Sequence, residues 1–171
     1  FGFQWNGEGG STTPLSQAET RFVREFCRAH DVALSLSFHC SGDIVFYPWG
    51  YAPQATPDLA IIDLLSSGYA GAAGYAHGNS WADYETHGEL IDDLYGTRGA
   101  ICLTVEISNS ASLLAQTFER NRPAMNWLSD EAGEGLHGTI TDAQTGAPLE
   151  ARIRITGNTV PSYSDPAGHV H

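Results

Sequence analysis

The chain has 171 residues, of which 8 are basic and 20 acidic, so its formal net charge is −12, and it contains no lysine. This balance excludes the basic surface of a nucleic-acid-binding protein. The missing lysine excludes the phosphate-binding side chain of a P-loop and the amine of Schiff-base chemistry. No apolar run approaches the roughly 20 residues of a membrane-spanning helix. We therefore expect an acidic globular protein with no nucleic-acid partner and no membrane span.

The first residue and the cysteines bear on processing and redox state. The chain begins at Phe1 without a charged and apolar signal segment, so we expect its start to be a processing site or a cut through a longer protein. Three cysteines, an odd number without Cys-x-x-Cys spacing, argue against a disulfide framework and a thiolate metal site. We expect reduced and mostly buried thiols at Cys27, Cys40 and Cys102.

Periodic apolar patterns predict alternating helices and strands over the first 132 residues. Residues 1–15 are predicted as a loop, and the capping-box pattern Ser16-Gln-Ala-Glu19 as the start of a helix that ends near His30. The further predicted elements are a strand over 32–38, a strand over 44–47, a helix over 57–76 that begins with Pro57, a loop over 77–99, a strand over 101–107, and two helices separated by Pro123 that end near Glu131. This alternation predicts an α/β fold of helices layered on a sheet.

The sequence pattern changes at Gly133. Residues 136–141 and 151–156 alternate apolar and polar side chains around a turn, which predicts antiparallel strands. Two or three strands fit into this part of the chain, whereas a β-sandwich needs about seven. We therefore predict two domains, an α/β domain over 1–132 and a truncated antiparallel β-sandwich segment over 133–171.

His39 and Glu106 each end a predicted strand, on the face opposite the large aliphatic side chains. In open α/β sheets, ligands bind beyond the carboxyl ends of the strands. An imidazole and a carboxylate at that edge have the chemistry of a metal ligand and a general base. The pattern alone leaves a second interpretation open, in which His39 is a hydrogen-bonded core histidine and Glu106 caps a helix.

Several segments together resemble the zinc metallocarboxypeptidases. Ser37-Phe-His39-Cys-Ser41 and the following Tyr47-Pro-Trp-Gly50 are similar to the family's His-Ser-Tyr and Tyr-Pro-Tyr/Trp-Gly stretch. Tyr84-Glu-Thr-His-Gly88-Glu-Leu-Ile-Asp92 resembles its Tyr-x-x-x-Gly-x-x-x-Asp segment, and Leu103-Thr-Val-Glu106-Ile107 its Phe-Thr-x-Glu-Leu strand. Residues 135–151 resemble the start of the transthyretin-like domain that follows the catalytic domain in the carboxypeptidase E/D/N branch. The resemblance covers essentially the whole chain. It implies the C-terminal half of a three-layer α/β/α domain with a mixed, mostly parallel sheet.

The resemblance implies a zinc-dependent enzyme that removes residues from the C-termini of peptides or proteins, with one Zn²⁺ per catalytic domain. It implies that His39 is a zinc ligand and that Glu106 is the general base, which passes a proton from the attacking water to the leaving amine. Tyr84 is implied as a mobile phenol that caps bound substrate. Ile91 and Thr104 are implied to line the pocket for the C-terminal side chain. A secreted or periplasmic location is implied as well.

The chain departs from the family pattern at the other zinc ligands. It contains no His-x-x-Glu motif, and Phe1-Gly-Phe-Gln-Trp5 resembles the residues directly after the family's substrate-binding Asn-Arg pair. We therefore expect the N-terminal half of the same domain as a missing partner. We expect the isolated chain to be inactive, because catalytic zinc takes three protein ligands. Near the expected pocket, Ile91 favours an apolar C-terminal residue and Glu89 a basic one, and this choice stays open.

Two other functions stay open on the same scaffold, namely a non-catalytic relative that binds peptide ends and a zinc deacylase of N-acyl amino acids. Three structural features are predicted. His39 and Glu106 should lie at neighbouring strand ends and face one cleft. Residues 77–99 should be irregular and exposed, with Tyr84 at the rim of that cleft. The resemblance also implies cis peptide bonds at Cys40–Ser41, Pro48–Trp49 and Ser108–Asn109.

Overall fold

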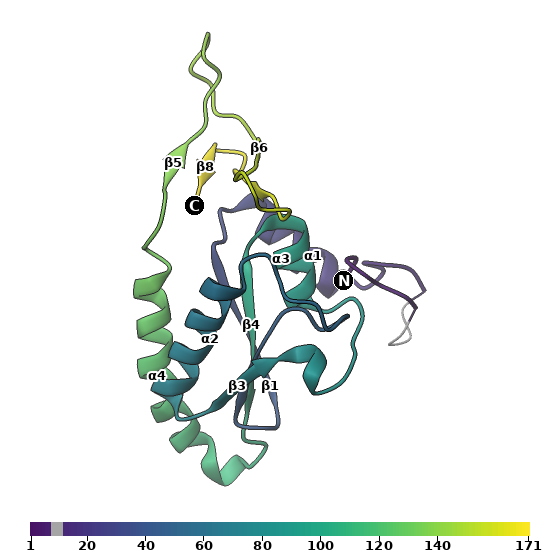
Figure 1. Cartoon of the computed structure of the whole chain (residues 1–171), viewed down its shortest axis with the longest axis vertical. Helices are drawn as coiled ribbons and strands as arrows, with labels where there is room; N and C mark the ends of the chain where they lie inside the picture. The colour runs from purple at the N-terminus through teal and green to yellow at the C-terminus, as the bar shows by residue number, and fades with distance from the viewer. Residues whose placement is uncertain (8–11) are drawn as a thin grey trace.

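The computed structural model describes residues 1–7 and 12–171. At its centre is a four-stranded sheet in the order β1-β4-β2-β3 (Figure 1), with β1 at Leu34–Cys40, β2 at Ile44–Tyr47, β3 at Ala76–Asn79 and β4 at Ile101–Ile107. β1 is parallel to β4 and β2 is parallel to β3, while β2 and β4 are antiparallel. The predicted α/β fold with a mixed, mostly parallel sheet is confirmed.

Helices cover both faces of this sheet. One face carries α2 (Leu59–Ala73) and α4 (Leu114–Glu131), which Figure 1 shows side by side, and the other carries α1 (Ala18–Ala29) and α3 (Leu90–Arg98). The alternation along β4 explains the three layers. Leu103 and Val105 pack with residues of α2 and α4, whereas Cys102, which points to the opposite face, packs with residues of α1 and α3.

The region 77–99 is more regular than predicted. It includes most of β3, the 3-10 turn η2 (Ser80–Ala82) and the whole of α3, so that only residues 83–89 and Gly99 are irregular. The prediction failed because Asp92 and Asp93 interrupt the apolar pattern of α3. Both carboxylates are fully buried, and they accept hydrogen bonds from backbone N–H groups of other segments. β3 was not predicted because it is a polar strand at the edge of the sheet and lacks the apolar alternation of a buried strand.

Helices α1 and α2 both begin later than predicted. α1 has Gln17 as its N-cap, so the capping box at Ser16 does not form, and the Ser16 carbonyl instead accepts a hydrogen bond from the Arg21 guanidinium at 2.6 Å. α2 has Asp58 as its N-cap and starts at Leu59, so Pro57 lies outside the helix. The helix ends at Gly74, whose φ of 69° ends the helical conformation before the predicted residue 76.

Pro123 does not separate two helices, contrary to the prediction. α4 is continuous through it and follows the 3-10 turn η3 (Ala111–Leu113). A proline inside a helix removes one backbone hydrogen bond and crowds the preceding turn. Ala124 and Leu128 of α4 are buried in the cluster that includes Leu65 and Tyr69 of α2, and we attribute the continuity of α4 to this packing.

The C-terminal part consists of short antiparallel strand pairs, as predicted, but the predicted strands over 136–141 and 151–156 are shorter and pair with later strands instead of with each other. β5 (Gly138–Thr139) pairs with β8 (His169–Val170), β6 (Arg152–Ile153) pairs with β7 (Ser162–Tyr163), and the chain between β5 and β6 projects from the molecule in Figure 1. This part contacts the α/β layers, because Asn158 donates to the Asp58 carboxylate at 2.6 Å and the Arg98 guanidinium lies over the Tyr163 ring. A domain boundary at residue 132 stays a prediction.

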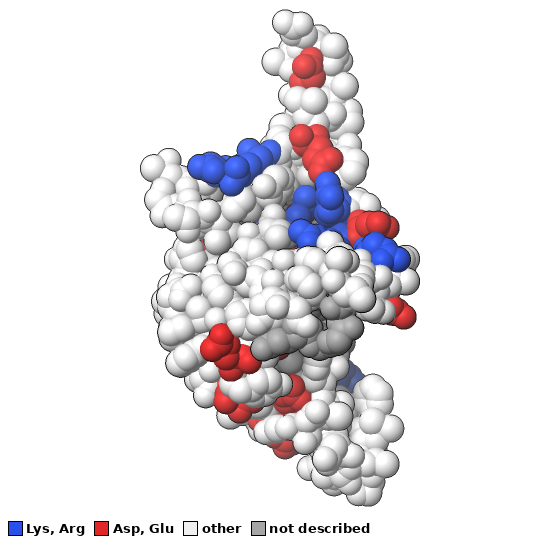
Figure 2. All heavy atoms as spheres, turned by 90° about the vertical axis from the view of Figure 1, so that its right-hand side faces the viewer, with Lys and Arg blue, Asp and Glu red and all other residues white. Residues whose placement is uncertain are grey.

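Charges are unevenly distributed over the face shown in Figure 2, where most visible arginine atoms lie towards the projecting end and a group of carboxylates lies towards the other end. Among the arginines that form ion pairs with carboxylates are Arg24, with Asp93 at 3.2 Å, and Arg98, with Glu150 at 4.0 Å. No helix in the described part of the chain is long and apolar enough to cross a membrane.

Backbone and thiol predictions are mostly confirmed. The peptide bonds Cys40–Ser41 and Pro48–Trp49 are cis, as the resemblance implied, whereas Ser108–Asn109 is not. All three cysteines are free, and Cys27 and Cys102 are buried as expected. Cys40 is the exception, because it is exposed at the end of β1.

Candidate active site

His39 and Glu106 lie side by side at the carboxyl ends of neighbouring strands. The parallel register of β1 and β4 pairs His39 with Glu106, and two residues earlier it pairs Ser37 with Thr104. Side chains two residues apart on a strand share a face, so these four polar side chains form one patch on the α1/α3 face of the sheet. The predicted neighbourhood of His39 and Glu106 is confirmed.

The His39 ring has a partner that the sequence analysis missed. The Ser37 hydroxyl lies 3.0 Å from Nε2 of His39, and the described residues give Nδ1 no hydrogen-bond partner. The imidazole is exposed. Contact with Ser37 fixes one ring nitrogen and leaves the other available, which is the arrangement of a histidine that binds a metal through its second nitrogen. The signal was present in the sequence, because Ser37 is two residues from His39 in a predicted strand.

Glu106 borders a pocket of about 460 Å³ that also has Tyr84 in its wall. The Oε2 atom of Glu106 is buried and has no hydrogen-bond partner among the described residues. Burying a carboxylate oxygen without a hydrogen-bond partner costs free energy, so it is expected where a ligand or a water molecule supplies the missing hydrogen bond. The turn after β1 forms another wall of this pocket with Cys40, Ser41 and Gly42. His39 does not line this pocket, so the prediction that His39 and Glu106 face one cleft is wrong for the pocket. Glu106 and Tyr84 do share it, as predicted.

Tyr84 lies at the pocket rim. Its side chain is 66% exposed, and it belongs to the irregular segment 83–89 between η2 and α3. The described residues offer no hydrogen bond to its hydroxyl, so no internal hydrogen bond holds the phenol in place. The predicted rim position is confirmed, and the capping role stays a proposal.

The other three predicted substrate-binding residues lie outside that pocket. Ile91 is 1% exposed and packs in α3 against Cys27 and Cys102, in the core between the sheet and the helices. Glu89 is the N-cap of α3 and accepts a long hydrogen bond of 3.4 Å from Ser80. Thr104 stands two residues before Glu106 on the same face of β4. The structure therefore joins Thr104 to the polar patch and keeps Ile91 and Glu89 apart from it.

Asp92 has a structural role that the sequence analysis missed. Its buried carboxylate accepts hydrogen bonds from the backbone N–H groups of Gly50 and Tyr51 at 2.9 and 3.1 Å. Burial raises the pKa of Asp92 to about 6, and the neighbouring Glu89 adds to the increase, while the backbone donors oppose it. The carboxylate thereby fixes the segment after the cis bond at Pro48–Trp49.

The donor set fits a metal ion only in part. An exposed imidazole with an unpartnered Nδ1 and a carboxylate with an unpartnered oxygen are suited to a ligand and a base. Nevertheless, no group of three or more histidine, cysteine, aspartate or glutamate side chains able to hold a metal ion occurs among residues 1–7 and 12–171. His39 can therefore supply one ligand of a zinc site, and the described residues do not complete it.

Comparison with known sequences identifies the family. The sequence profile described as zinc carboxypeptidase matches residues 1–124, which is most of the chain. The chain belongs to the zinc carboxypeptidase family. The match runs from the first residue into α4 and includes His39, Tyr84 and Glu106, so the whole polar patch lies inside the family region.

Individual relatives are distant and much longer. Carboxypeptidase D of Drosophila melanogaster is 25% identical over 169 residues, which cover 82% of this chain and 12% of that protein. Carboxypeptidase A1 of Rattus norvegicus is 27% identical over 88 residues, which cover 51% of this chain and 20% of the relative. The chain thus spans a fifth or less of these curated relatives.

Solved structures agree on the fold. The crystal structures of carboxypeptidase A from Helicoverpa armigera and of thrombin activatable fibrinolysis inhibitor both superpose with a TM-score of 0.63, at 18% and 19% identity. Each superposition covers 71% of this chain and 36% of the solved chain. The described elements therefore correspond to about a third of those proteins.

Proposed function

We propose that the protein containing this chain is a zinc metallocarboxypeptidase that hydrolyses the C-terminal peptide bond of peptides or proteins. The observation that carries the proposal is the register of β1 and β4, which sets the His39 imidazole beside the Glu106 carboxylate at the strand ends. Family membership supports the same chemistry. The family resemblance also favours a secreted or periplasmic location.

Each residue of the site has one task in this proposal. His39 contributes a ligand through Nδ1, while Ser37 holds its Nε2. A bound zinc ion supplies a Lewis acid for the scissile carbonyl and lowers the pKa of its water. Glu106 accepts a proton from the attacking water at its unpartnered Oε2 and donates it to the leaving amine. Tyr84 closes over the bound peptide end from the rim.

We propose that the remaining ligands come from residues outside this chain, because residues 1–7 and 12–171 offer no group of three ligands, and two features of the surface support this. β1 is an edge strand of the described sheet, so its outer backbone groups have no strand partner there. Large apolar residues are exposed on β1 itself, with Phe38 at 45%, and on α1, with Phe22 at 71% and Phe26 at 52%. We propose that an upstream half of the same domain covers these surfaces and supplies two zinc ligands and the substrate-binding arginines. By this proposal the isolated chain is inactive.

Substrate preference is proposed from Glu89, Ile91 and Thr104. The Glu89 carboxylate lies close to Gly50, because a methyl group added to Gly50 would be 2.6 Å from it. Gly50 belongs to the segment whose backbone N–H groups bind Asp92. A carboxylate at this position favours a basic C-terminal side chain, whereas the buried Ile91 favours an apolar one. Peptides ending in arginine and in phenylalanine, compared by kcat/KM, separate the two preferences.

The test is hydrolysis of a peptide with a free C-terminus by the protein with its upstream residues present. We expect cleavage of this peptide and none of its C-terminal amide, and loss of activity on zinc removal. Glu106→Gln should lower kcat by about 10²- to 10⁴-fold. Glu119→Gln changes an exposed glutamate that pairs with Arg122 on α4, and should leave kcat unchanged.

Other outcomes identify the alternative functions. Binding of peptide C-termini without cleavage indicates a non-catalytic relative. Faster hydrolysis of an N-acyl amino acid than of the peptide indicates a deacylase. Full peptidase activity of the isolated chain contradicts the proposed need for further ligands.

A further inference from the structure

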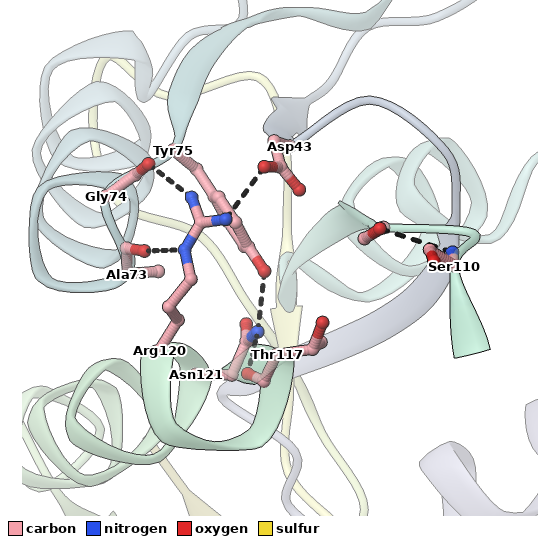
Figure 3. A network of polar contacts seen from close by, with 9 residues as sticks. Asp43, Ala73, Gly74, Tyr75, Ser110, Thr117, Arg120 and Asn121 are labelled. Carbon is pink, nitrogen blue, oxygen red and sulfur yellow. Dashed lines mark hydrogen bonds and ion pairs between the residues drawn. The ribbon is translucent and has the colours of Figure 1, made fainter. Parts of the chain in front are cut away.

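Arg120 of α4 joins three segments that are distant in the sequence (Figure 3). Its Nη1 lies 2.7 Å from Oδ2 of Asp43, in the turn between β1 and β2. Its Nε and Nη2 donate to the carbonyls of Ala73 and Gly74 at the C-terminal end of α2. The guanidinium also lies over the Tyr75 ring, 4.2 Å from the centroid. One side chain therefore ties α4, the end of α2 and the β1–β2 turn together.

The Tyr75 ring under the Arg120 guanidinium is held by hydrogen bonds of the buried Asn121. Asn121 donates to the Tyr75 hydroxyl at 2.8 Å and to the Thr117 carbonyl at 2.9 Å, as Figure 3 shows, and it accepts a hydrogen bond from Tyr69 at 2.8 Å. Asn121, Thr117 and Tyr69 are all buried. The position of the guanidinium is thus fixed by the α2–α4 interface and not by the turn that it contacts.

The turn that Arg120 contacts forms a wall of the active-site pocket. Cys40, Ser41 and Gly42 line the pocket together with Glu106. Gly42 packs so tightly against Glu106 that a methyl group on Gly42 would lie 3.3 Å from the Cβ atom of Glu106. Any shift of the turn therefore changes the surface against which Glu106 rests.

Asp43 connects the ion pair with Arg120 to the backbone of the turn between β1 and β2. Its φ is +51°, in the left-handed region that aspartate and asparagine tolerate better than most residues. Its carbonyl accepts the backbone N–H of Ala76 at 3.0 Å, which joins the turn to the start of β3. A rare backbone conformation persists where surrounding contacts enforce it. The ion pair with Arg120 is one of those contacts.

We propose that Arg120 is a positioning residue: through Asp43 it fixes the 40–43 turn and with it the pocket wall beside Glu106. The effect on catalysis rests on the proposed function, whereas the effect on the turn does not. Arg120 also binds the last carbonyls of α2, which is a purely structural role. Asp43→Asn separates the two roles, because it removes the carboxylate, keeps the tolerance for positive φ and leaves the bonds to α2 in place.

The reaction rate of Cys40 with a water-soluble aromatic disulfide reports on the turn directly. Cys40 is the exposed thiol of the turn, whereas Cys27 and Cys102 are buried and their burial raises the pKa of both thiols. The buried pair therefore reports unfolding in the same sample. We expect Asp43→Asn and Arg120→Met each to raise the Cys40 rate about threefold, the gain expected from losing one partly exposed ion pair.

Two comparisons complete the design. The double variant should react no faster than the faster single variant, because both changes break the same contact. Arg122→Met removes an exposed arginine of the same helix, which pairs with Glu119 and not with the turn, and should leave the Cys40 rate unchanged. With active protein, Asp43→Asn should lower kcat about tenfold with a smaller change in KM.

An unchanged Cys40 rate in both single variants overturns the proposal. The proposal is also overturned if Asp43→Asn raises the Cys40 rate but has the same kcat as the Arg122→Met control. If Cys27 and Cys102 become reactive in Arg120→Met, that variant has unfolded, and Asp43→Asn decides. A wild-type protein without peptidase activity contradicts the proposed function, and the Cys40 rates then decide alone whether Arg120 fixes the turn.

Discussion

His39 and Glu106 are register partners across two parallel strands, and the residues that set this register are apolar. Leu36 of β1 and its partner Leu103 of β4 face α2 and α4, so the hydrophobic layer fixes which residues stand opposite each other. A slip by one residue would turn Leu103 out of the core and Glu106 into it. The pairing of imidazole and carboxylate is thus a consequence of packing on the opposite face of the sheet.

Ser37 should control how well His39 binds zinc. Ser37→Ala removes the hydroxyl 3.0 Å from Nε2 of His39, so the ring loses the contact that orients it. Loss of such a partner typically costs 10- to 100-fold in metal affinity, and we expect zinc binding about tenfold weaker by competition with a chelator. Ser37→Thr keeps the hydroxyl and should restore the affinity. Ser67→Ala, which loses only a bond to the Leu64 carbonyl of α2, is the control, and equal affinities in the two alanine variants would contradict the role.

Two glycines of α2 should respond oppositely to alanine. A methyl group at Gly68 would lie 2.1 Å from the Trp127 ring of α4, whereas one at Gly71 would meet nothing within 4 Å. Gly68→Ala overpacks the α2–α4 interface and should lower the free energy of unfolding by about 2 kcal/mol. Gly71→Ala should raise it by about 0.5 to 1 kcal/mol through helix propensity. Urea unfolding measures both, and a stable Gly68→Ala variant would show that this interface is loosely packed.

Asp92 should make folding stability depend on pH. Its pKa rises from 3.8 to about 6 in the folded protein, mainly because the carboxyl group is buried. The folded state therefore binds the proton more tightly, so the contribution of Asp92 to stability is fully present below about pH 4 and falls as the pH rises through about 6. The loss is on the order of 3 kcal/mol and is nearly complete about one pH unit above the folded pKa.

The measurement for Asp92 is urea unfolding between pH 4 and pH 7. In Asp92→Asn the contribution of this group to the slope disappears, so the stability difference from the wild type changes over that interval. Asp130→Asn replaces an exposed carboxylate of α4 and should keep the wild-type slope. A wild-type slope in Asp92→Asn would show that other groups cause the pH dependence.

The sequence predicted the elements whose pattern is local. β4 was predicted over its full length, because Ile101, Leu103, Val105 and Ile107 alternate with smaller or polar residues. The pair His39 and Glu106 followed from strand ends in the same way. Helix α3 was missed because its buried aspartates accept N–H groups from residues such as Gly50 and Phe3, which are distant in sequence. No local pattern reveals a carboxylate buried for that reason.

The contact between Asp43 and Arg120 was equally beyond the sequence pattern. The two residues are 77 positions apart, and the contact depends on how α4 packs against α2. The pocket wall at Ser41 and Gly42 depends in turn on the conformation of that turn. Prediction from one sequence therefore reached the residues proposed to carry the chemistry, and it did not reach the residues proposed to position them.

Tyr84 and Tyr95 should separate substrate binding from stability. The Tyr84 phenol is exposed at the pocket rim without an internal hydrogen bond in the described residues. The Tyr95 ring is 1% exposed, and its hydroxyl donates to the Asp58 carboxylate at 2.7 Å. We expect Tyr84→Phe to leave the melting temperature unchanged and to raise KM about fivefold, the effect of one lost hydrogen bond to the substrate. Tyr95→Phe should lower the free energy of unfolding by about 1 kcal/mol and leave KM unchanged.

The contrast between these two variants is the informative result, because both remove one hydroxyl group from a tyrosine. Peptide hydrolysis gives KM, and thermal unfolding gives the melting temperature, on the same preparations. A loss of stability in Tyr84→Phe would mean that the phenol is held by the fold and cannot act as a mobile cap. An unchanged KM in Tyr84→Phe and a raised one in Tyr84→Ala would assign the contact with substrate to the aromatic ring, because loss of the hydroxyl alone then has no effect.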